Sequence, residues 1–426
     1  MIITQFEKQG LCGIPGDYIC VMPNVLNKRE FTVIDLFSGC GGLTEGLHQV
    51  ELNGAKFRTL AAVDIWPAAC DTLERKFSKS DVPIKVFRSG LTPQVIRQLK
   101  STYGVSQVDL IVGGPPCQGF STSGKRALDD PRNSLVKMYL KTIEALQPRA
   151  FLLENVVGFT TFQNGRICRE VIDSAKKIGY RVFPAVLQAS LYGVPQRRRR
   201  FVMVGVKDGD FSWPDFVNAS NGKPIPGSLK RFWTPDSNGD SLYVQEIPKG
   251  FKELTFSEAT IDLPKVLAGE SGSTYLKLGN DPNWFIKYIQ EGNDAELLGH
   301  KSVNHARHLV EMMEKLEEGQ SAFDRFKKGH RLRPTSGFSN SYMRIHGNKP
   351  APTITRNFTT PSSANCIHPA QARALTPREG ARLQSFPDRY EFLGTLTEQR
   401  LQIGNAVPPL LAKALGTAIM KNLLSR

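Results

Sequence analysis

The chain has 426 residues, and 40% of them are hydrophobic, which is enough to bury a full core and more than one domain. Its 55 Lys and Arg residues outnumber its 40 Asp and Glu residues, and the resulting net charge of +15 favours a polyanionic partner, with nucleic acid first. No run approaches the roughly 20 apolar residues of a membrane helix, and the N-terminus does not read as a secretory signal, so we expect a cytoplasmic protein without a membrane partner.

Strands and helices alternate over the first half of the chain. Apolar runs predict strands at 31–37, 59–65, 108–114, 149–156, 181–188 and 200–206. A glycine turn leads into a helix after the first strand, and further helices are predicted at 134–146 and 167–179. This alternation predicts an α/β fold with a parallel sheet covered by helices, whose ligands bind beyond the carboxyl ends of the strands.

The composition of the sequence changes after Val206, where Gly, Pro, Asn and Asp become frequent and the alternation of strands and helices stops. We therefore predict a first domain over residues 1–206, of which 1–30 are an N-terminal extension. A second, smaller and irregular domain follows over 207–388. The apolar helical pattern of 389–426 suggests that this last segment rejoins the first domain.

The first glycine turn, "DLFSGCGG" (35–42), allows a ligand to approach the backbone at the start of a helix. A dinucleotide fingerprint would have a third glycine where Thr44 stands. Asp64 ends the next strand, where a carboxylate can accept hydrogen bonds from ribose hydroxyls. Together these features indicate a nucleoside-containing cofactor, and the alternative is an ordinary tight turn followed by a strand-end aspartate.

A cysteine follows the strand at 108–114 in the run "GGPPC", where two prolines fix the backbone before Cys117. A thiol on such a turn can act as a nucleophile if its surroundings favour the thiolate, whereas a lone cysteine is more often a small buried hydrophobe. The seven cysteines include no C-x-x-C pair, which suits reduced thiols better than disulfides or a zinc site.

Polar side chains at two other strand boundaries could assist this thiol. Glu154 ends the strand in "LLENV" and is a candidate acid or hydrogen-bond partner for a base. The arginines of "QRRRR" (196–200) precede another strand, and Arg198 and Arg200 should share a face because strand side chains alternate. The alternative for these arginines is a solvated basic run.

The motifs "DLFSGCGG", "GGPPCQGFS", "ENV", "QRRRR", "LTPREGARLQSFPD" and "IGNAVPP" occur in an order that resembles the DNA (cytosine-5) methyltransferases, specifically the bacterial or phage restriction-modification type. The resemblance runs from Phe31 to about Leu410, with a variable region in between. It implies a Rossmann-like catalytic domain that binds S-adenosylmethionine and a target-recognition domain over 207–388. It also implies methyl transfer to C5 of a flipped-out cytosine in a specific double-stranded DNA sequence.

The resemblance also assigns roles to individual residues. Cys117 would attack C6 of the cytosine, Glu154 would hold the N3 edge, and Arg198 and Arg200 would orient the pyrimidine or support Glu154. Ser123, Arg132 and Thr353 would contact DNA. The S-adenosylmethionine pocket would be lined by Phe37, Ser38, Gly39, Gly41, Gly42, Asp64, Ile65, Leu91, Pro116, Leu135, Asn405 and Val407.

One segment departs from the family pattern. Many members have Gly-Asp-Ile where this chain has Ser-Gly-Leu-Thr at 89–92, so Gly90 cannot supply the carboxylate that contacts the adenine amino group. A backbone group or a neighbouring side chain would have to replace that contact.

Other functions remain open at this stage. The related tRNA cytosine methyltransferases share the motifs but usually have a compact recognition region, and a catalytically idle DNA-binding homologue is a further alternative. We expect a monomer, with a cognate restriction endonuclease as a possible partner at the same site. His300, His305 and His308 have the spacing of metal ligands on a helix, but no cysteine or carboxylate completes a set, so we expect no metal and a structural or DNA-contacting role.

Overall fold

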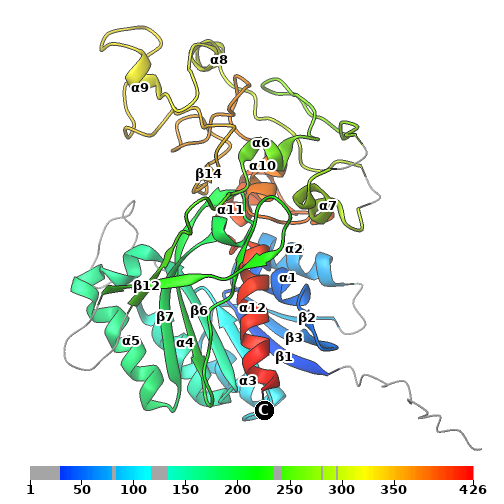
Figure 1. Cartoon of the computed structure of the whole chain (residues 1–426), viewed down its shortest axis with the longest axis vertical. Coiled ribbons are helices and arrows are strands. Elements are labelled where there is room, and N and C mark those ends of the chain that lie inside the picture. Colours follow the sequence, from blue (N-terminus) through cyan, green and yellow to red (C-terminus); the bar gives the residue numbers. More distant parts are fainter. Residues whose placement is uncertain are drawn as a thin grey trace, which may run out of the picture.

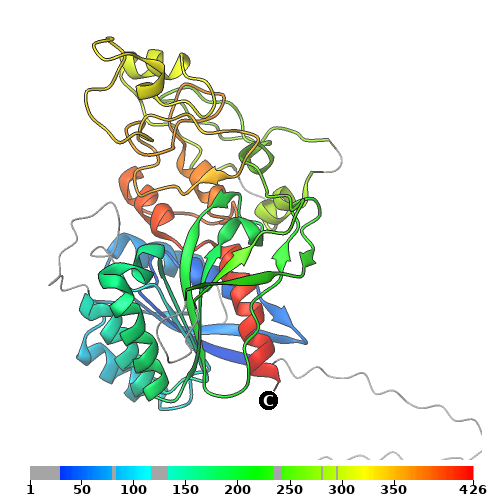
Figure 2. The same ribbon diagram turned by 60° about the vertical axis from the view of Figure 1, so that its left-hand side comes forward.

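The computed structural model describes residues 29–78, 83–116, 133–233, 242–279, 282–293 and 296–425. Figures 1 and 2 show a lower lobe built on one large sheet and an upper lobe of short helices and long loops. The C-terminal helix α12 (Pro409–Leu424) returns to the lower lobe and crosses the sheet.

The large sheet holds ten strands within the described ranges, in the order β12-β13-β7-β9-β6-β5-β1-β3-β2, with β4 also paired to β3. Their bounds are β1 (Glu30–Leu36), β2 (Glu51–Leu52), β3 (Ala55–Asp64), β4 (Lys85–Arg88), β5 (Leu110–Gly113), β6 (Ala150–Val156), β7 (Arg181–Gln188), β9 (Arg199–Val206), β12 (Ser228–Trp233) and β13 (Leu242–Glu246).

The sheet is mixed, so the prediction of a parallel sheet was incomplete. Five consecutive strands are parallel to one another, in the order β4, β3, β1, β5 and β6. In contrast, β9 is antiparallel to both of its neighbours, β6 and β7. Only residues 189–198 connect β7 to β9. This link is too short for the crossover that a parallel neighbour requires, so the chain must turn back.

Helices cover both faces of the sheet. On one face, α1 (Gly42–His48) and α12 share a core with Val33 and Leu152. On the other face, three helices pack on Ile34 and Leu153. These helices are α3 (Pro93–Tyr103), α4 (Asn133–Leu146) and α5 (Arg166–Lys177), while α2 (Pro67–Phe77) packs beside β3 and β4. The side chains of β1 and β6 therefore alternate between two cores, as expected for strands buried on both faces.

The stretch Leu396–Leu424 is long and apolar enough to resemble a membrane span by composition, but 72% of its most apolar window is buried inside the protein. It consists of α11 (Leu396–Asn405) and α12, which are separated at Val407 and Pro408. The buried residues of α12, including Leu411 and Leu415, belong to the main core. This segment is therefore a core element of the lower lobe.

The sheet extends past Val206, where sequence analysis predicted the second domain to begin. Strands β12 and β13 form a hairpin, and β13 lies parallel to β7 at residues Tyr243 and Val244. The intervening strands β10 (Phe216–Val217) and β11 (Pro224–Ile225) pair with each other. Residues up to Glu246 thus still contribute to the lower lobe. The sequence did not predict this contribution, because a pairing with a distant edge strand leaves no local signal in a Gly- and Pro-rich segment.

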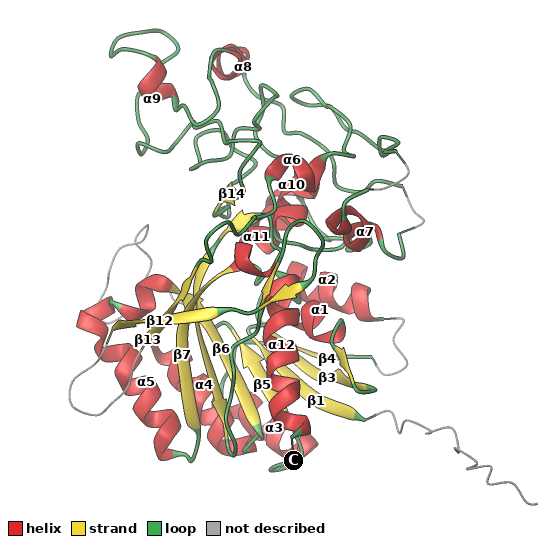
Figure 3. Ribbon diagram, in the orientation of Figure 1, coloured by secondary structure: helices red, strands yellow, loops and turns green. Residues whose placement is uncertain are grey.

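The upper lobe consists mainly of loops, as Figure 3 shows. Its elements are α6 (Phe256–Thr260), α7 (Trp284–Gln290), α8 (Arg307–Glu314), α9 (Ala322–Arg325), β14 (Ala351–Pro352) and α10 (Pro377–Leu383). Buried ion pairs support them: Arg382 is fully buried and bonds the carboxylates of Asp262 and Asp388. Such pairs fix the position of α10, since a buried charge without its partner is strongly destabilising.

Candidate active site

The glycine turn between β1 and α1 has the open backbone that its sequence predicted. Phe37, Gly39 and Gly41 all have positive φ angles, of 58°, 53° and 87°. A side chain at Gly41 would come within 3.0 Å of the Tyr390 hydroxyl, so only glycine fits there. Ser38 lies in this turn, and its buried Oγ has no partner among the described residues.

Asp64 holds this turn from the end of β3. Its Oδ2 accepts the N–H of Gly39 and its Oδ1 accepts the N–H of Trp66, both at 2.8 Å. Burial raises the pKa of the Asp64 carboxyl, and these hydrogen bonds oppose that rise. Each carboxylate oxygen retains a lone pair that could accept a further hydrogen bond.

The side chain of Ile65 follows Asp64 and is 73% exposed, which is unusual for a residue at the end of a core strand. Ile65 Cδ1 lies 3.7 Å from the position that a Cβ on Gly90 would occupy, so the two residues face each other. Leu91 is different, because its side chain is buried in the core under α3. The exposed apolar surface of Ile65 can pack against one face of a flat aromatic ring, and Gly90 adds no side chain that would block it.

The C-terminal motif "IGNAVPP" lies directly against the glycine turn. A Cβ on Gly42 would come within 2.2 Å of Val407 O, and one on Gly46 within 2.3 Å of Pro409 O. The two glycines therefore let α1 approach this segment closely. Asn405 is exposed at the end of α11, and Val407 is buried beside the turn.

Glu154 and Arg200 form an ion pair at the ends of β6 and β9. Arg200 Nε lies 3.0 Å from Glu154 Oε1, and the two side chains are only 13% and 12% exposed. The strands are antiparallel, with Val156 opposite Arg200 and Glu154 opposite Val202. The pair is therefore a diagonal contact on one face of the sheet.

The strand end that leads to Cys117 lies beside this pair. A Cβ on Gly114 would come within 3.1 Å of Glu154 Oε2, and Asn155 Nδ2 donates to Pro115 O at 3.2 Å. Asn155, the residue after Glu154 in the "ENV" motif, was given no role from the sequence. Pro116 is exposed at the end of this segment, and Leu135 is half-buried in the first turn of α4. Cys117, Ser123 and Arg132 lie outside the described residues.

Arg198 is buried between β8 (Gln196–Arg197) and β9, with 2% of its surface exposed. Its Nη2 donates to Gly404 O at 3.3 Å and to Ala406 O at 3.1 Å. Its Nε and Nη1 have no partner among the described residues. Burial lowers the pKa of Arg198, and the charge of Arg200 lowers it further. The residue thus connects "QRRRR" to the backbone around Asn405.

Thr353 reaches the same region from the upper lobe. Its hydroxyl donates to Arg197 O at 2.8 Å, next to the pairing of β14 with β8. The amide of Gln196, which sequence analysis left without a role, connects three segments: it donates to Leu383 O and Gln384 Oε1 and accepts from Ile354 N.

The four cysteines in the described part of the chain are poor nucleophiles. Cys40, Cys70, Cys168 and Cys366 are buried and free. Burial raises the pKa of Cys70 to about 11 and of Cys168 to about 12, and it raises the pKa values of Cys40 and Cys366 as well. These thiols stay protonated near neutral pH.

The three histidines do not form the helical ligand pair that their spacing suggested, because α8 begins at Arg307 and His305 lies outside it. His300 makes hydrogen bonds through both ring nitrogens, to Thr376 Oγ1 at 3.0 Å and to Pro264 O at 2.9 Å. His305 Nε2 accepts from Ala374 N at 3.2 Å. His300 and His305 therefore hold the upper lobe together.

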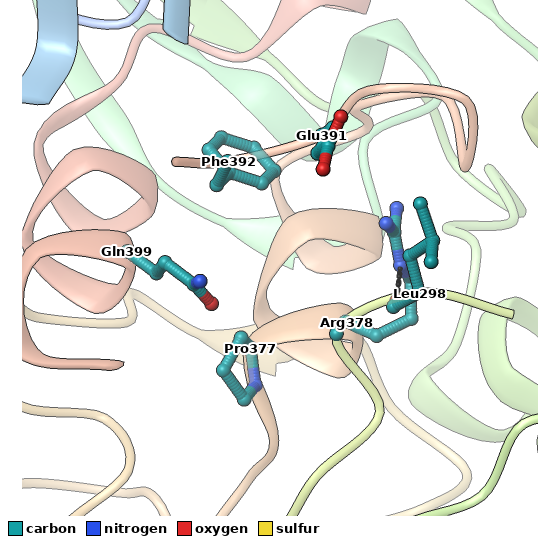
Figure 4. A pocket seen from close by; sticks show the side chains of 7 residues that line it. Leu298, Pro377, Arg378, Glu391, Phe392 and Gln399 are labelled. Atoms are coloured by element: carbon teal, nitrogen blue, oxygen red, sulfur yellow. Dashed lines mark hydrogen bonds between the residues drawn. The ribbon is translucent and has the colours of Figure 1, made fainter. Parts of the chain in front are cut away.

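A small cavity of about 150 Å³ lies where the upper lobe meets the linker to α11 (Figure 4). Arg378 lines it, and this guanidinium is already bonded to Leu298 O, Asp388 Oδ1 and Tyr390 O. The other lining residues are Leu298, Gly299, Pro377, Glu391, Phe392 and Gln399. None of them is a predicted site residue, so this cavity is separate from the glycine turn and from Glu154.

Residues 31–421 match the model of the C-5 cytosine-specific DNA methylase family. The Type II methyltransferase M1.HphI of Haemophilus parahaemolyticus is 34% identical over 395 residues, which cover 92% of this chain and 87% of that relative. The Type II methyltransferase M.XorII of Xanthomonas oryzae is 34% identical over 92% of this chain and 84% of its own length. An Escherichia coli crystal structure whose description is of a prophage-encoded DNA modification methyltransferase is 25% identical, with a TM-score of 0.65, over 93% of this chain and all of that one.

The chain belongs to the C-5 cytosine-specific DNA methylase family. It is a DNA (cytosine-5)-methyltransferase, which transfers a methyl group from S-adenosylmethionine to C5 of cytosine in DNA. The predicted fold class, an α/β methyltransferase domain with a smaller irregular domain, is confirmed.

Proposed function

We propose that this enzyme is a modification methyltransferase that recognises one specific sequence in double-stranded DNA, acts as a monomer in the bacterial cytoplasm, and protects that sequence from a cognate restriction endonuclease. The relatives named as Type II methyltransferases support this reading, and so does the net charge of +15. The single observation that carries the chemistry is the buried pair of Glu154 and Arg200 beside the strand end that leads to Cys117.

The residues around the glycine turn fit S-adenosylmethionine, which supplies an activated methyl group when bound. The open backbone at Gly39 and Gly41 leaves room for the amino-acid portion, and Asp64 has lone pairs for the ribose hydroxyls. The exposed Ile65 opposite Gly90 suits the adenine ring, and the buried Ser38 Oγ is available to a polar group. The remaining predicted lining residues would complete the pocket. They are Phe37, Gly42, Leu91, Pro116, Leu135, Asn405 and Val407.

In the proposed mechanism, the Cys117 thiolate adds to C6 of the cytosine while Glu154 delivers a proton to N3. This addition moves electron density onto C5, which can then form a bond to the methyl carbon as the S–CH3 bond breaks, so that S-adenosylhomocysteine would be the product. Loss of the C5 proton to water restores the double bond, expels the thiolate and returns the N3 proton to Glu154. Arg200 holds the Glu154 carboxyl group in position before and after this proton transfer.

Arg198 has a positioning role in this proposal, because it bonds the backbone on both sides of Asn405 and lies two residues before Arg200 in the chain. Its Nε and Nη1, which have no partner among the described residues, are available to the bound cytosine or to the segment around Cys117. Ser123, Arg132 and Thr353 would contact the DNA backbone. Thr353 would use its backbone N–H, because phosphate oxygens only accept hydrogen bonds and its hydroxyl hydrogen is already donated to Arg197 O.

Residues 207–388 would select the target site, with the stretch up to Glu246 also extending the catalytic sheet. The segment 389–426 would complete the cofactor pocket through the contact of Val407 with Gly42. The target cytosine must leave the duplex, because neither face of a stacked base is accessible to a thiol.

DNA that carries 5-fluorocytosine at the target tests this mechanism directly, because fluorine at C5 cannot leave as a cation and blocks the release of Cys117. With S-adenosylmethionine present, we expect a covalent complex that survives denaturing electrophoresis and maps to the peptide with Cys117. Cys117→Ser should form none, since a serine hydroxyl is scarcely ionised near pH 7. A crosslink to Cys40 or Cys168 would refute the assignment.

Methylation of tRNA, the alternative left open by the sequence, has no observation in its favour beyond the shared fold. A structure of Spodoptera frugiperda DNMT2 has a TM-score of 0.55 at 17% identity, which shows a shared fold alone. Parallel assays with duplex DNA and tRNA would decide, and turnover on tRNA alone would overturn the proposed DNA specificity.

A further inference from the structure

Phe338 is the most exposed large hydrophobic side chain in the described part of the protein, at 77%. It belongs to the upper lobe, in the segment that follows α9 (Figures 1 and 2). Single exposed apolar side chains are common on protein surfaces, so exposure alone says little. Phe338 is distinguished by a backbone that is hydrogen-bonded on both sides and by the basic segment that precedes it in the chain.

The backbone N–H and the carbonyl group of Phe338 are both hydrogen-bonded to Ser341. Phe338 N donates to Ser341 Oγ at 3.1 Å, and Phe338 O accepts from Ser341 N at 2.9 Å, while Ser341 itself is buried. Gly337 precedes it with φ 148°, and a Cβ there would come within 3.1 Å of the Phe323 ring. The turn therefore presents the Phe338 ring to solvent from a fixed backbone rather than from a loose loop.

The preceding segment is strongly basic and equally well anchored. Five of the nine residues from Arg325 to Arg333 are Lys or Arg. Phe326 and Leu332 are buried in the local core, so the chain between them is fixed at both ends. Lys327 and Lys328 are exposed and form no ion pair with any residue that the structure describes. A fixed, exposed aromatic ring that follows two exposed lysines in the same segment of the upper lobe matches the chemistry of a nucleic-acid surface.

A series of contacts joins this surface to the catalytic residues. Asn365 N donates to Asn340 O at 3.0 Å, which ties the Phe338 turn to the segment 361–365. Ser363 Oγ and Thr355 Oγ1 are 2.8 Å apart, and two residues earlier Thr353 donates to Arg197 O. The Phe338 turn is therefore connected, through the chain that carries Thr353, to β8, which directly precedes the strand that carries Arg200.

We propose that Phe338 is a specificity-determining residue that contacts base edges of the target duplex, while Lys327 and Lys328 contact its phosphates. This inference rests on the proposed function, in which residues 207–388 select the site. Phosphate contacts position a protein on DNA without reading the sequence, whereas apolar contacts with base edges, such as the thymine methyl group, distinguish one sequence from another.

The experiment compares two duplexes that differ only at the recognition site. Sequencing of methylated DNA from an expressing strain identifies the site, and one duplex carries it while the other does not. Phe338→Ala should weaken binding to the site duplex about tenfold or more and leave binding to the other duplex unchanged. Val105→Ala, which shortens an exposed side chain (45%) outside the residues proposed to select the site, is the control and should change neither affinity.

A Lys327→Ala/Lys328→Ala double variant should weaken binding to both duplexes equally and lower the slope of log affinity against log salt by about 2. Phe338→Ala binding like the wild type, or losing affinity equally for both duplexes, would overturn the role of Phe338. Wild-type enzyme without preference for any duplex would instead refute the proposed function, so the two failures are distinguishable. Thermal melting of Phe338→Ala should match the wild type, since the ring makes few contacts.

Discussion

Arg200 Nε lies 3.0 Å from Glu154 Oε1, and the antiparallel register of β6 and β9 fixes this pair. Because the two side chains are largely buried, water competes weakly with their contact. The guanidinium holds the carboxyl group at the end of β6, where Gly114 leaves it open to the strand end before Cys117.

Glu154→Gln should fold and bind DNA but transfer methyl groups about 10²- to 10⁴-fold more slowly, because an amide cannot deliver a proton to N3. Single-turnover assays with saturating DNA and cofactor measure the effect. The control is Glu253→Gln, which breaks the neighbouring pair of Glu253 with Arg197 and should leave the rate within about twofold. A normal rate for Glu154→Gln would remove Glu154 from the mechanism.

Much of the lower lobe could be predicted from the sequence. The strand predicted at 181–188 is β7, with the same bounds, because its apolar run is bounded by polar residues. The direction of β9 could not be predicted, since a buried strand has the same composition whether it runs parallel or antiparallel. That direction nevertheless decides which residues meet Glu154.

The candidate active site, like the sheet, could be predicted from the sequence only in part. Glu154 and Arg200 were predicted because charged residues at strand boundaries are conspicuous, and the structure brings them together. The burial of Arg198 was not predictable, because "QRRRR" has the composition of a solvated run. Its acceptors, Gly404 O and Ala406 O, are backbone atoms more than 200 residues away in the sequence.

Asn155→Ala should lower the methyl-transfer rate about tenfold without changing the affinity for S-adenosylmethionine. The side-chain amide donates to Pro115 O at 3.2 Å and so fixes the strand end that precedes Cys117, and small displacements of a reacting group are costly. Rates at saturating cofactor, together with calorimetric cofactor binding, separate the two effects. Equal losses in rate and cofactor affinity would indicate a general disturbance of the site instead.

Arg198→Lys should weaken S-adenosylmethionine binding about tenfold, because a lysine cannot bond Gly404 O and Ala406 O from one planar group. The turn around Asn405 would lose its fixed position. Calorimetry of cofactor binding provides the readout, and the kcat at saturating cofactor should fall less than the affinity.

Arg199→Lys is the matched control, since Arg199 is the exposed neighbour of Arg198 and should tolerate the change. If both variants bound the cofactor like the wild type, Arg198 would not position the cofactor pocket.

Asp35→Asn should stabilise the protein at pH 8 and have little effect near pH 4. Asp35 is fully buried beneath the glycine turn, and burial raises its pKa to about 7, opposed by a hydrogen bond from Thr44 and reinforced by the charge of Asp64. Between its ordinary value of 3.8 and about 7, the folded protein keeps a proton that the unfolded chain loses. Stability therefore falls as the pH rises through this interval, and the loss is complete above about pH 7.

The asparagine has no proton to lose and can still accept the hydrogen bond from Thr44, so the variant avoids this loss. Each pKa unit corresponds to about 1.4 kcal/mol, so the expected gain at pH 8 is a few kcal/mol, or several degrees in Tm. Thermal melts of wild type and variant at pH 4 to 5 and at pH 8 measure the difference. Asp173→Asn, which changes an exposed carboxylate on α5, should show no such dependence on pH. If the difference in Tm between Asp35→Asn and the wild type were the same at both pH values, the Asp35 carboxyl would not titrate in this range.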